Sequence, residues 1–269
     1  MQLVELQHAW PSLELHGVAL FAVSYDSVDT LAAFAEQRGI SYPLLSDEGS
    51  HTIRALGLLN EHLAEQHAVY GITTREEQRG VAYPGTFVLD EEGVIVEKHF
   101  EQSYRVRPTA QLSEEYAFGA TGSVAPHAEH TQLSGLELQA WTDSPTYRPY
   151  QQVRLHVQLA IQAGMHAYAT PVPDGYTPLH LRVEPLEGLT AGAIDRPAPR
   201  PFHVDGVDEE FLVYEGTFRM TLPLMFTKNL GPTKLVLELA YQTCTETTCF
   251  PPARIGLELS LAGLDLIRD

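Results

Sequence analysis

Two kinds of hydrophobic pattern divide the chain. Up to about residue 118, continuous apolar runs alternate with stretches in which apolar residues recur at helical spacing. From residue 136 onward, short segments alternate apolar and polar positions and are separated by Pro and Gly. The first pattern predicts an α/β layer structure, and the second predicts an antiparallel β-sandwich. We expect domains at 1–118 and 136–269, joined by a linker at 119–135 that is rich in small and polar residues.

In the first half, apolar residues at helical spacing predict an opening helix that presents Leu3, Leu6 and Trp10 on one face. The run at 17–24 has the continuous apolar character of a strand buried in a parallel sheet. The remaining expected elements are helices at 28–37, 50–58 and 109–116, a strand at 42–45, and a β-hairpin formed by 84–90 and 94–96. In the second half, strands are expected at 136–141, 153–161, 179–183, 211–222 and 235–241.

Cys244 and Cys249 are the only cysteines among the 269 residues, and four residues separate them. Alternating apolar runs precede and follow the pair, which predicts a β-hairpin with one cysteine at the end of each strand. Facing Cα atoms of an antiparallel pair lie about 4.5–5.5 Å apart, within the range of about 4.4–6.8 Å that a disulfide needs. The sequence therefore predicts that the two sulfurs can bond.

The role of such a disulfide has two main interpretations. Cross-linking a loop this short contributes only about 2 kcal/mol, and a domain of this size has enough residues for a core without it. We therefore expect a reversible dithiol that exchanges with a partner, with a purely structural disulfide as the alternative. Two cysteines cannot complete a tetrahedral zinc site. Since His127 and His130 are interpreted as solvated linker residues, we expect neither a metal nor another cofactor.

The charge and hydropathy of the chain disfavour nucleic acid and membranes as binding partners. The net charge of −18, from 17 basic and 35 acidic residues, disfavours nucleic acid and anionic membrane surfaces. No apolar run reaches the length of about 18 residues that a membrane-spanning helix needs, so we do not expect a transmembrane protein. The first residues lack the basic and apolar regions of a signal peptide.

Three segments of the first half carry a family resemblance. They are LFAVSYDS at 20–27, YPLLSD at 42–47 and YPGTFVLDEEG at 83–93. With these segments, residues 1–115 resemble the redoxins of the thioredoxin fold, the family called AhpC/TSA. The resemblance implies a thioredoxin-like domain and a cis peptide bond before Pro84, beside the position of the reactive thiol. An ordinary proline at the start of a strand is the alternative, because cis is the minority isomer.

The first half departs from this family in one respect. Redoxins carry the attacking cysteine at the start of the first long helix, whereas this chain starts inside that helix and has no cysteine before Cys244. Because peroxidases and dithiol reductases of this kind need a thiolate, we expect the first half to be inactive as written. We also expect unpaired strand edges where a central strand of the family's sheet is absent. Peroxide reduction by a longer parent protein remains an alternative, and an upstream in-frame cysteine would support it.

The second half resembles the N-terminal periplasmic domain of the thiol:disulfide interchange protein DsbD. The resemblance spans about 136–262 and is carried by GMHAY at 164–168, the stretch 171–176, LEG at 186–188, YQTC at 241–244 and CFPP at 249–252. It implies an immunoglobulin-like sandwich whose cysteine pair passes electrons to thiol proteins, with aromatic residues that shield the pair. We expect His166 and Tyr168 near the sulfurs, with Tyr241 in support. Plain strand packing is the alternative for these residues.

The leading functional hypothesis is thiol–disulfide exchange through Cys244 and Cys249 with partner thiol proteins. Which cysteine attacks stays open, although the resemblance favours Cys249. No Lys, Arg or His adjoins either cysteine in sequence, so activation must come from the fold or from the partner. Four threonines surround the pair and can either solvate a thiolate or form a turn. A non-enzymatic docking module is the alternative function. The resemblance also implies an extracytoplasmic or periplasmic location in a bacterium.

Overall fold

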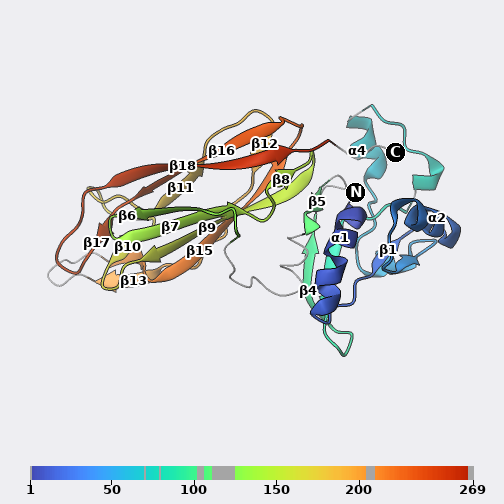
Figure 1. Cartoon of the computed structure of the whole chain (residues 1–269), viewed down its shortest axis with the longest axis horizontal. Coiled ribbons are helices and arrows are strands. Elements are labelled where there is room, and N and C mark those ends of the chain that lie inside the picture. Colours follow the sequence, from blue (N-terminus) through green and yellow to red (C-terminus); the bar gives the residue numbers. More distant parts are fainter. Residues whose placement is uncertain are drawn as a thin grey trace. The chain divides into compact units, whose positions relative to one another are not determined.

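The computed structural model describes residues 2–69, 71–78, 80–101, 106–110, 125–203 and 210–265. These residues fall into two compact units, unit 1 within Met1–Thr121 and unit 2 within Gly122–Leu266 (Figure 1). In the part of the chain that the structure describes, no helix is long and apolar enough to cross a membrane.

Unit 1 alternates helices with short strands, as its sequence predicts. Its helical elements are α1 (Gln2–Leu15), α2 (Val28–Arg38), α3 (His51–Ala55), α4 (Leu63–Val69) and the 3-10 turn η1 (Glu76–Gln78). Its strands are β1 (Ala22–Ser24), β2 (Leu44–Ser46), β3 (Gly85–Leu89), β4 (Ile95–Phe100) and β5 (Arg107–Pro108). The sequence does not predict α4, because one of the two positions that this helix buries is a histidine, His67, which breaks the apolar stripe. The expected helix at 109–116 lies largely outside the described residues.

Local signals account for the helices that the sequence does predict. The hydroxyl of Ser27 caps α2 by accepting a hydrogen bond from the backbone N–H of Thr30, and Gly39 ends the helix in the left-handed conformation at φ 63°. The apolar face of α1 buries Leu6 in a cluster with Ile40 and Tyr42. These contacts place α1 against the segment that leads from α2 into β2.

The strands of unit 1 correct one prediction and agree with another. The expected buried strand at 17–24 shortens to β1, in which Val23 remains 50 % exposed, and Phe21 just before it is 57 % exposed. Among the described residues β1 pairs only with β2, in parallel, and Leu45 opposite Val23 is also 45 % exposed. A strand is buried on both faces only when other elements cover both, and here one face is uncovered. Among the described residues nothing pairs with the other edge of β1, as we expected.

Pro84 stands at the start of β3, and the expected cis bond before it is not found. Among the described residues the cis peptide bond lies between Thr170 and Pro171. The carbonyl of Pro84 accepts a hydrogen bond from the N–H of Glu101 at 3.0 Å, which extends the β3–β4 hairpin by one step. Pro84 thus has the majority trans isomer and directly precedes β3, which agrees with the alternative of an ordinary proline at a strand start.

Unit 2 is a β-sandwich, as predicted (Figure 1). One layer has the strand order β12-β15-β9-β7-β6, and the other has the order β11-β16-β18-β8. A smaller sheet, β13-β14-β10-β17, carries the site described below. The strand bounds are β6 (Glu129–Leu133), β7 (Leu136–Thr142), β8 (Thr146–Tyr147), β9 (Gln151–Ile161), β10 (His166–Tyr168), β11 (His180–Val183), β12 (Leu189–Ala191), β13 (Arg200–His203), β14 (Glu210–Tyr214), β15 (Thr217–Phe226), β16 (Pro232–Tyr241), β17 (Thr243–Cys244) and β18 (Ala253–Gly263).

The core of unit 2 follows the twofold alternation of its strands. In β9 every second residue from Val153 to Leu159 is buried, and in β16 Leu235, Leu237 and Leu239 are each at most 2 % exposed. These residues belong to one hydrophobic cluster that also receives side chains from β7, β15 and β18. Because residues at i and i+2 share a face, this alternation directs one side of each sheet into the common core.

Two expectations about unit 2 need correction. The segment 211–222 is not one strand but contributes to β14 and β15, which Gly216 separates at φ 63°. Part of the expected linker at 119–135 forms β6, which pairs with β7. The two histidines of the expected linker both have partners in β7: His127 Nε2 lies 2.8 Å from the carbonyl of Thr142, and His130 Nε2 lies 2.8 Å from Glu137 Oε1. The small and polar residues of 119–135 do not predict a strand. The strand β6 forms because it pairs with β7.

Candidate functional site

Cys244 and Cys249 form a disulfide with a Cα–Cα distance of 4.0 Å, shorter than the range expected for facing strands. The β16–β18 ladder stops at Tyr241, before either cysteine. Cys244 then enters β17 and pairs with β10 in the small sheet, while Cys249 lies in the loop that returns to β18. Cys244 and Cys249 nevertheless face each other in an isolated antiparallel bridge, as we expected of the pair. What differs is that only Cys244 lies in a strand, and that this strand is β17 and not the end of β16.

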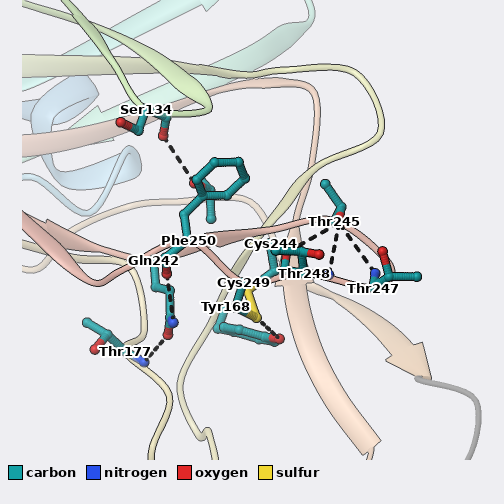
Figure 2. Close-up of a disulfide and its surroundings, with 11 residues drawn as sticks. Ser134, Tyr168, Thr177, Gln242, Cys244, Thr245, Thr247, Thr248, Cys249 and Phe250 are labelled. Carbon is teal, nitrogen blue, oxygen red and sulfur yellow. Dashed lines mark hydrogen bonds between the residues drawn. A yellow bond between two sulfur atoms is a disulfide. The ribbon is translucent and has the colours of Figure 1, made fainter.

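A threonine-based turn shapes the loop between the cysteines (Figure 2). The hydroxyl of Thr245 accepts hydrogen bonds from the N–H groups of Thr247 and Thr248 at 3.3 and 3.0 Å. The N–H of Thr245 donates to the carbonyl of Thr248 at 2.8 Å. Of the two roles considered for these threonines, turn formation is the one that Thr245 performs here.

Buried polar residues hold the base of the loop. The side-chain amide of Gln242 donates to the carbonyl of Phe250 at 3.0 Å, and its oxygen accepts from the N–H of Thr177 at 3.0 Å. The hydroxyl of Thr243 donates to the carbonyl of Ser134 at 3.1 Å. Figure 2 shows Gln242, Thr177 and Ser134 on one side of the disulfide and the Thr245 turn on the other. Because Gln242 and Thr243 are buried, their hydrogen bonds are costly to break, which keeps the loop in place whether or not the sulfurs are bonded.

The two cysteines differ in exposure. Cys244 is fully buried, with 0 % exposure, whereas Cys249 is exposed. The following residue, Phe250, is also 40 % exposed and forms an apolar neighbour of the open cysteine. Of the two cysteines, only Cys249 therefore presents surface to an approaching molecule.

An aromatic cluster covers the buried side of the disulfide. Cys244 packs there with Tyr168 and Phe211, and the ring of Tyr176 lies 4.9 Å from Tyr168 and 5.2 Å from Phe211, centroid to centroid. The hydroxyl of Tyr168 lies 3.6 Å from the sulfur of Cys249. Burial, followed by the nearby Tyr176, raises the pKa of Tyr168, so this hydroxyl stays protonated and can donate a hydrogen bond to sulfur.

His166 occupies the position in β10 that pairs with Cys244 in β17. It is 3 % exposed, and its ring lies 4.2 Å from that of Phe202 and 5.3 Å from that of Tyr168. Burial lowers the pKa of His166, because a charged imidazolium is poorly solvated in this cluster. The structure thus places His166 and Tyr168 beside the disulfide, while their chemical roles stay predictions.

Tyr241 and Pro84 are the other two residues that the sequence singled out as supporting residues. Tyr241 is 3 % exposed and packs in the main core of unit 2 rather than in the aromatic cluster, and burial raises the pKa of its hydroxyl. Pro84 belongs to unit 1 and is described there. A supporting role for Tyr241 at the disulfide stays a prediction, as does a role for Pro84 beside the thiol position of the redoxin half.

The structure adds residues that the sequence did not single out. Phe202 and Phe211 face each other across β13 and β14 and reach the cluster from far along the chain. Gln242 lies inside the cysteine motif, and its sequence position was the only signal that could have drawn attention to it. The aromatic residues gave no comparable signal, since a phenylalanine in an alternating strand also fits an ordinary core.

Comparisons with known proteins agree with this division of the chain. The model of the AhpC/TSA family matches residues 1–98. The model of the N-terminal region of the thiol:disulfide interchange protein DsbD matches residues 138–259. These two ranges lie within unit 1 and unit 2, respectively.

Individual relatives cover parts of the chain. Alkyl hydroperoxide reductase E of Mycobacterium tuberculosis is 32 % identical over 106 residues, which make up 39 % of this chain and 60 % of the relative. The chain thus spans little more than half the length of this curated relative. The N-terminal periplasmic domain of ScsB from Proteus mirabilis is 14 % identical, with a TM-score of 0.35 and coverage of 49 % of both chains. The reduced N-terminal domain of Neisseria meningitidis DsbD is 22 % identical, with a TM-score of 0.29 and coverage of 40 % of this chain and 78 % of the other.

The two halves therefore match different families. The curated relative and the first family model correspond to unit 1, and the disulfide lies in the range of the second model. The chain combines a segment that matches the AhpC/TSA family with a segment that matches the N-terminal region of the thiol:disulfide interchange protein DsbD.

Proposed function

We propose that this protein carries out thiol–disulfide exchange with partner thiol proteins through the Cys244–Cys249 pair. The observation that carries the proposal is the unequal exposure of the two cysteines, since Cys249 is an exposed residue and Cys244 is fully buried. Exchange proceeds by thiolate attack on one sulfur of a disulfide, and the other sulfur leaves. Accessible disulfides are the ones that take part in such reactions, whereas structural disulfides resist reduction.

The geometry supports an order of events. A partner thiolate attacks the sulfur of Cys249, the Cys244–Cys249 bond breaks, and its electron pair leaves on Cys244. The partner is then joined to Cys249 in a mixed disulfide, and the second thiol of the partner releases it. In the opposite direction, reduced Cys249 attacks a partner disulfide and Cys244 resolves the product. The hydroxyl of Tyr168 lies where it can hydrogen-bond to the Cys249 sulfur during these steps.

The proposal extends to fold and location. The match to the DsbD N-terminal model supports an immunoglobulin-like sandwich for unit 2 and an extracytoplasmic, periplasmic setting. The AhpC/TSA match supports a thioredoxin-like architecture for unit 1. Both cysteines of this sequence lie in unit 2, so the present chain has no thiol in residues 1–98 that could reduce a peroxide. We therefore assign the redox role to unit 2.

Two single-cysteine variants of the full chain test which sulfur reacts. In Cys244→Ser the exposed Cys249 remains, and in Cys249→Ser the buried Cys244 remains. We expect Cys244→Ser to form a mixed disulfide with a small aromatic disulfide at least about tenfold faster than its counterpart, because reaction requires access to the thiolate. Equal rates, or faster reaction of Cys249→Ser, would contradict the proposed order of attack.

A redox titration of the wild-type protein against dithiothreitol tests the function itself. We expect a midpoint potential above about −300 mV, the approximate boundary below which disulfides are structural. Electron exchange with a reduced thioredoxin-like protein should then be complete within the assay and absent from the double serine variant. A midpoint below that boundary would favour the alternative of a docking module with a structural disulfide.

A further inference from the structure

The small sheet aligns three polar groups across neighbouring strands. Cys244 in β17 pairs with His166 in β10, so their side chains project from the same face. On the other side of β10, Ala167 pairs with Tyr214, and continuing this register by one step brings Glu215 opposite His166. Directly opposed residues have Cβ atoms about 4.5–5.5 Å apart. The resulting row runs from the buried cysteine through the histidine to a carboxylate.

The environment of His166 favours a neutral ring with one nitrogen available. Its Nε2 is buried and has no hydrogen-bond partner among the described residues. The charged groups that act on it are Glu215 and Arg200, which form an ion pair with each other at the rim of the sheet. Burial has the largest effect on the pKa of His166 and lowers it, Glu215 opposes this shift and Arg200 adds to it. At neutral pH the imidazole is thus unprotonated and can accept a proton.

We propose that His166 is the acid–base partner of Cys244: it accepts the proton of the Cys244 thiol when this sulfur attacks a mixed disulfide at Cys249. This inference rests on the exchange function proposed above. Cys244 has no basic residue next to it in sequence, and as a fully buried thiol it ionises poorly unless a nearby group takes the proton. Cross-strand pairing supplies the base that the local sequence lacks.

Resolution of the mixed disulfide by Cys244 exchanges one sulfur–sulfur bond for another. The sulfur of Cys249 is joined to a partner sulfur, and Cys244 is a thiol. His166 takes the thiol proton, the Cys244 thiolate attacks the Cys249 sulfur, and the Cys244–Cys249 bond forms. The bond from Cys249 to the partner breaks, and its electron pair leaves with the partner sulfur, which takes up a proton from the imidazolium or from water. The protein is oxidised to the disulfide and the partner is reduced to a thiol.

An aromatic disulfide such as DTNB separates the two halves of this reaction in the reduced full-length protein. Attack by Cys249 releases a first equivalent of coloured thiolate, and resolution by Cys244 releases a second. In His166→Phe we expect an unchanged first phase and a second phase slowed by roughly 100-fold, the lower end of typical general-base effects. The second-phase rate of the wild-type protein should be nearly constant between about pH 7 and pH 8, whereas that of the variant should rise about tenfold per pH unit with the fraction of thiolate.

Matched variants separate chemistry from packing. His166→Phe keeps an aromatic ring against Phe202, and His166→Gln keeps a polar side chain without a titrating nitrogen. In both variants the second-phase rate should therefore no longer be constant between about pH 7 and pH 8. His156→Phe is the control, because His156 is also buried, at 1 % exposure, but stacks on Trp141 outside the aromatic cluster. It should leave both phases unchanged.

The outcomes distinguish the two proposals. If the wild-type protein shows no second phase, exchange through this pair fails. If the wild-type protein shows both phases and either His166 variant keeps the wild-type rate and pH plateau in the second, the assignment of His166 is overturned while exchange stands.

Discussion

Reduction of the Cys244–Cys249 disulfide should leave unit 2 folded. The hydrogen bonds that close the loop do not depend on the sulfur–sulfur bond: Phe250 N–H donates to Thr243 at 2.9 Å, and Gln242 holds the carbonyl of Phe250 at 3.0 Å. The large hydrophobic core lies in the sandwich and does not include either cysteine. The disulfide therefore contributes mainly by restricting the unfolded chain.

The size of this contribution follows from the length of the loop. The cysteines are 5 positions apart, and closing such a loop stabilises the folded state by about 2 kcal/mol in the chain-entropy model. Domains of this kind have free energies of unfolding of about 5–15 kcal/mol. Reduction should thus raise the unfolded fraction by about 30-fold without unfolding the protein.

Urea unfolding of the oxidised and reduced full chain measures this difference. Trp141, which is 3 % exposed in unit 2, reports the transition when Trp10 is replaced by Phe. The dependence of the free energy on urea concentration should change little, because nearly the same surface becomes exposed. The variant Cys249→Ser has no disulfide and controls for direct effects of the reductant. A loss above about 4 kcal/mol on reduction, or the absence of a cooperative transition, would show that the disulfide is mainly structural and refute the reasoning.

Three further predictions concern residues around the site. In the Cys244→Ser background, Tyr168→Phe should slow mixed-disulfide formation at Cys249 about fivefold, the effect of losing one hydrogen bond of about 1 kcal/mol to the thiolate. An unchanged rate would contradict this. Gly135→Ala should reduce the free energy of urea unfolding by about 1–3 kcal/mol more than Gly164→Ala. Both glycines have positive φ, but only at Gly135 would a Cβ lie 2.5 Å from a methionine methyl and 2.7 Å from a threonine hydroxyl. Equal losses in the two variants would argue against this close packing. Because the pKa of His166 is lowered in the folded state, the unfolded state binds its proton more readily, and the free energy of unfolding should fall as pH drops below about 6.5. His166→Phe should make that fall shallower by at most about 1.4 kcal/mol per pH unit. Parallel plots of the free energy of unfolding against pH for the two proteins would refute this.

Local patterns were sufficient for much of the fold. The predicted helix at 28–37 corresponds to α2, which Ser27 and Gly39 cap at its two ends, and alternating leucines predicted β16. These signals work because capping and twofold alternation depend on residues close in sequence. The pattern could not show that Phe21 and Val23 stay exposed, since burial depends on what covers a strand and not on the strand itself.

The amino-acid sequence by itself determined that one cysteine pair exists, that it is close enough to bond, and that it follows a strand of a β-rich second half. The family resemblance also suggested His166 near the sulfurs. Only the tertiary structure decided that Cys244 is buried and Cys249 exposed, and that His166 pairs directly with Cys244 across two strands. The physical reason is that a disulfide over a short loop is a local property of the chain. Accessibility and acid–base neighbours depend instead on which strands pair, and pairing is set by the packing of the whole sandwich.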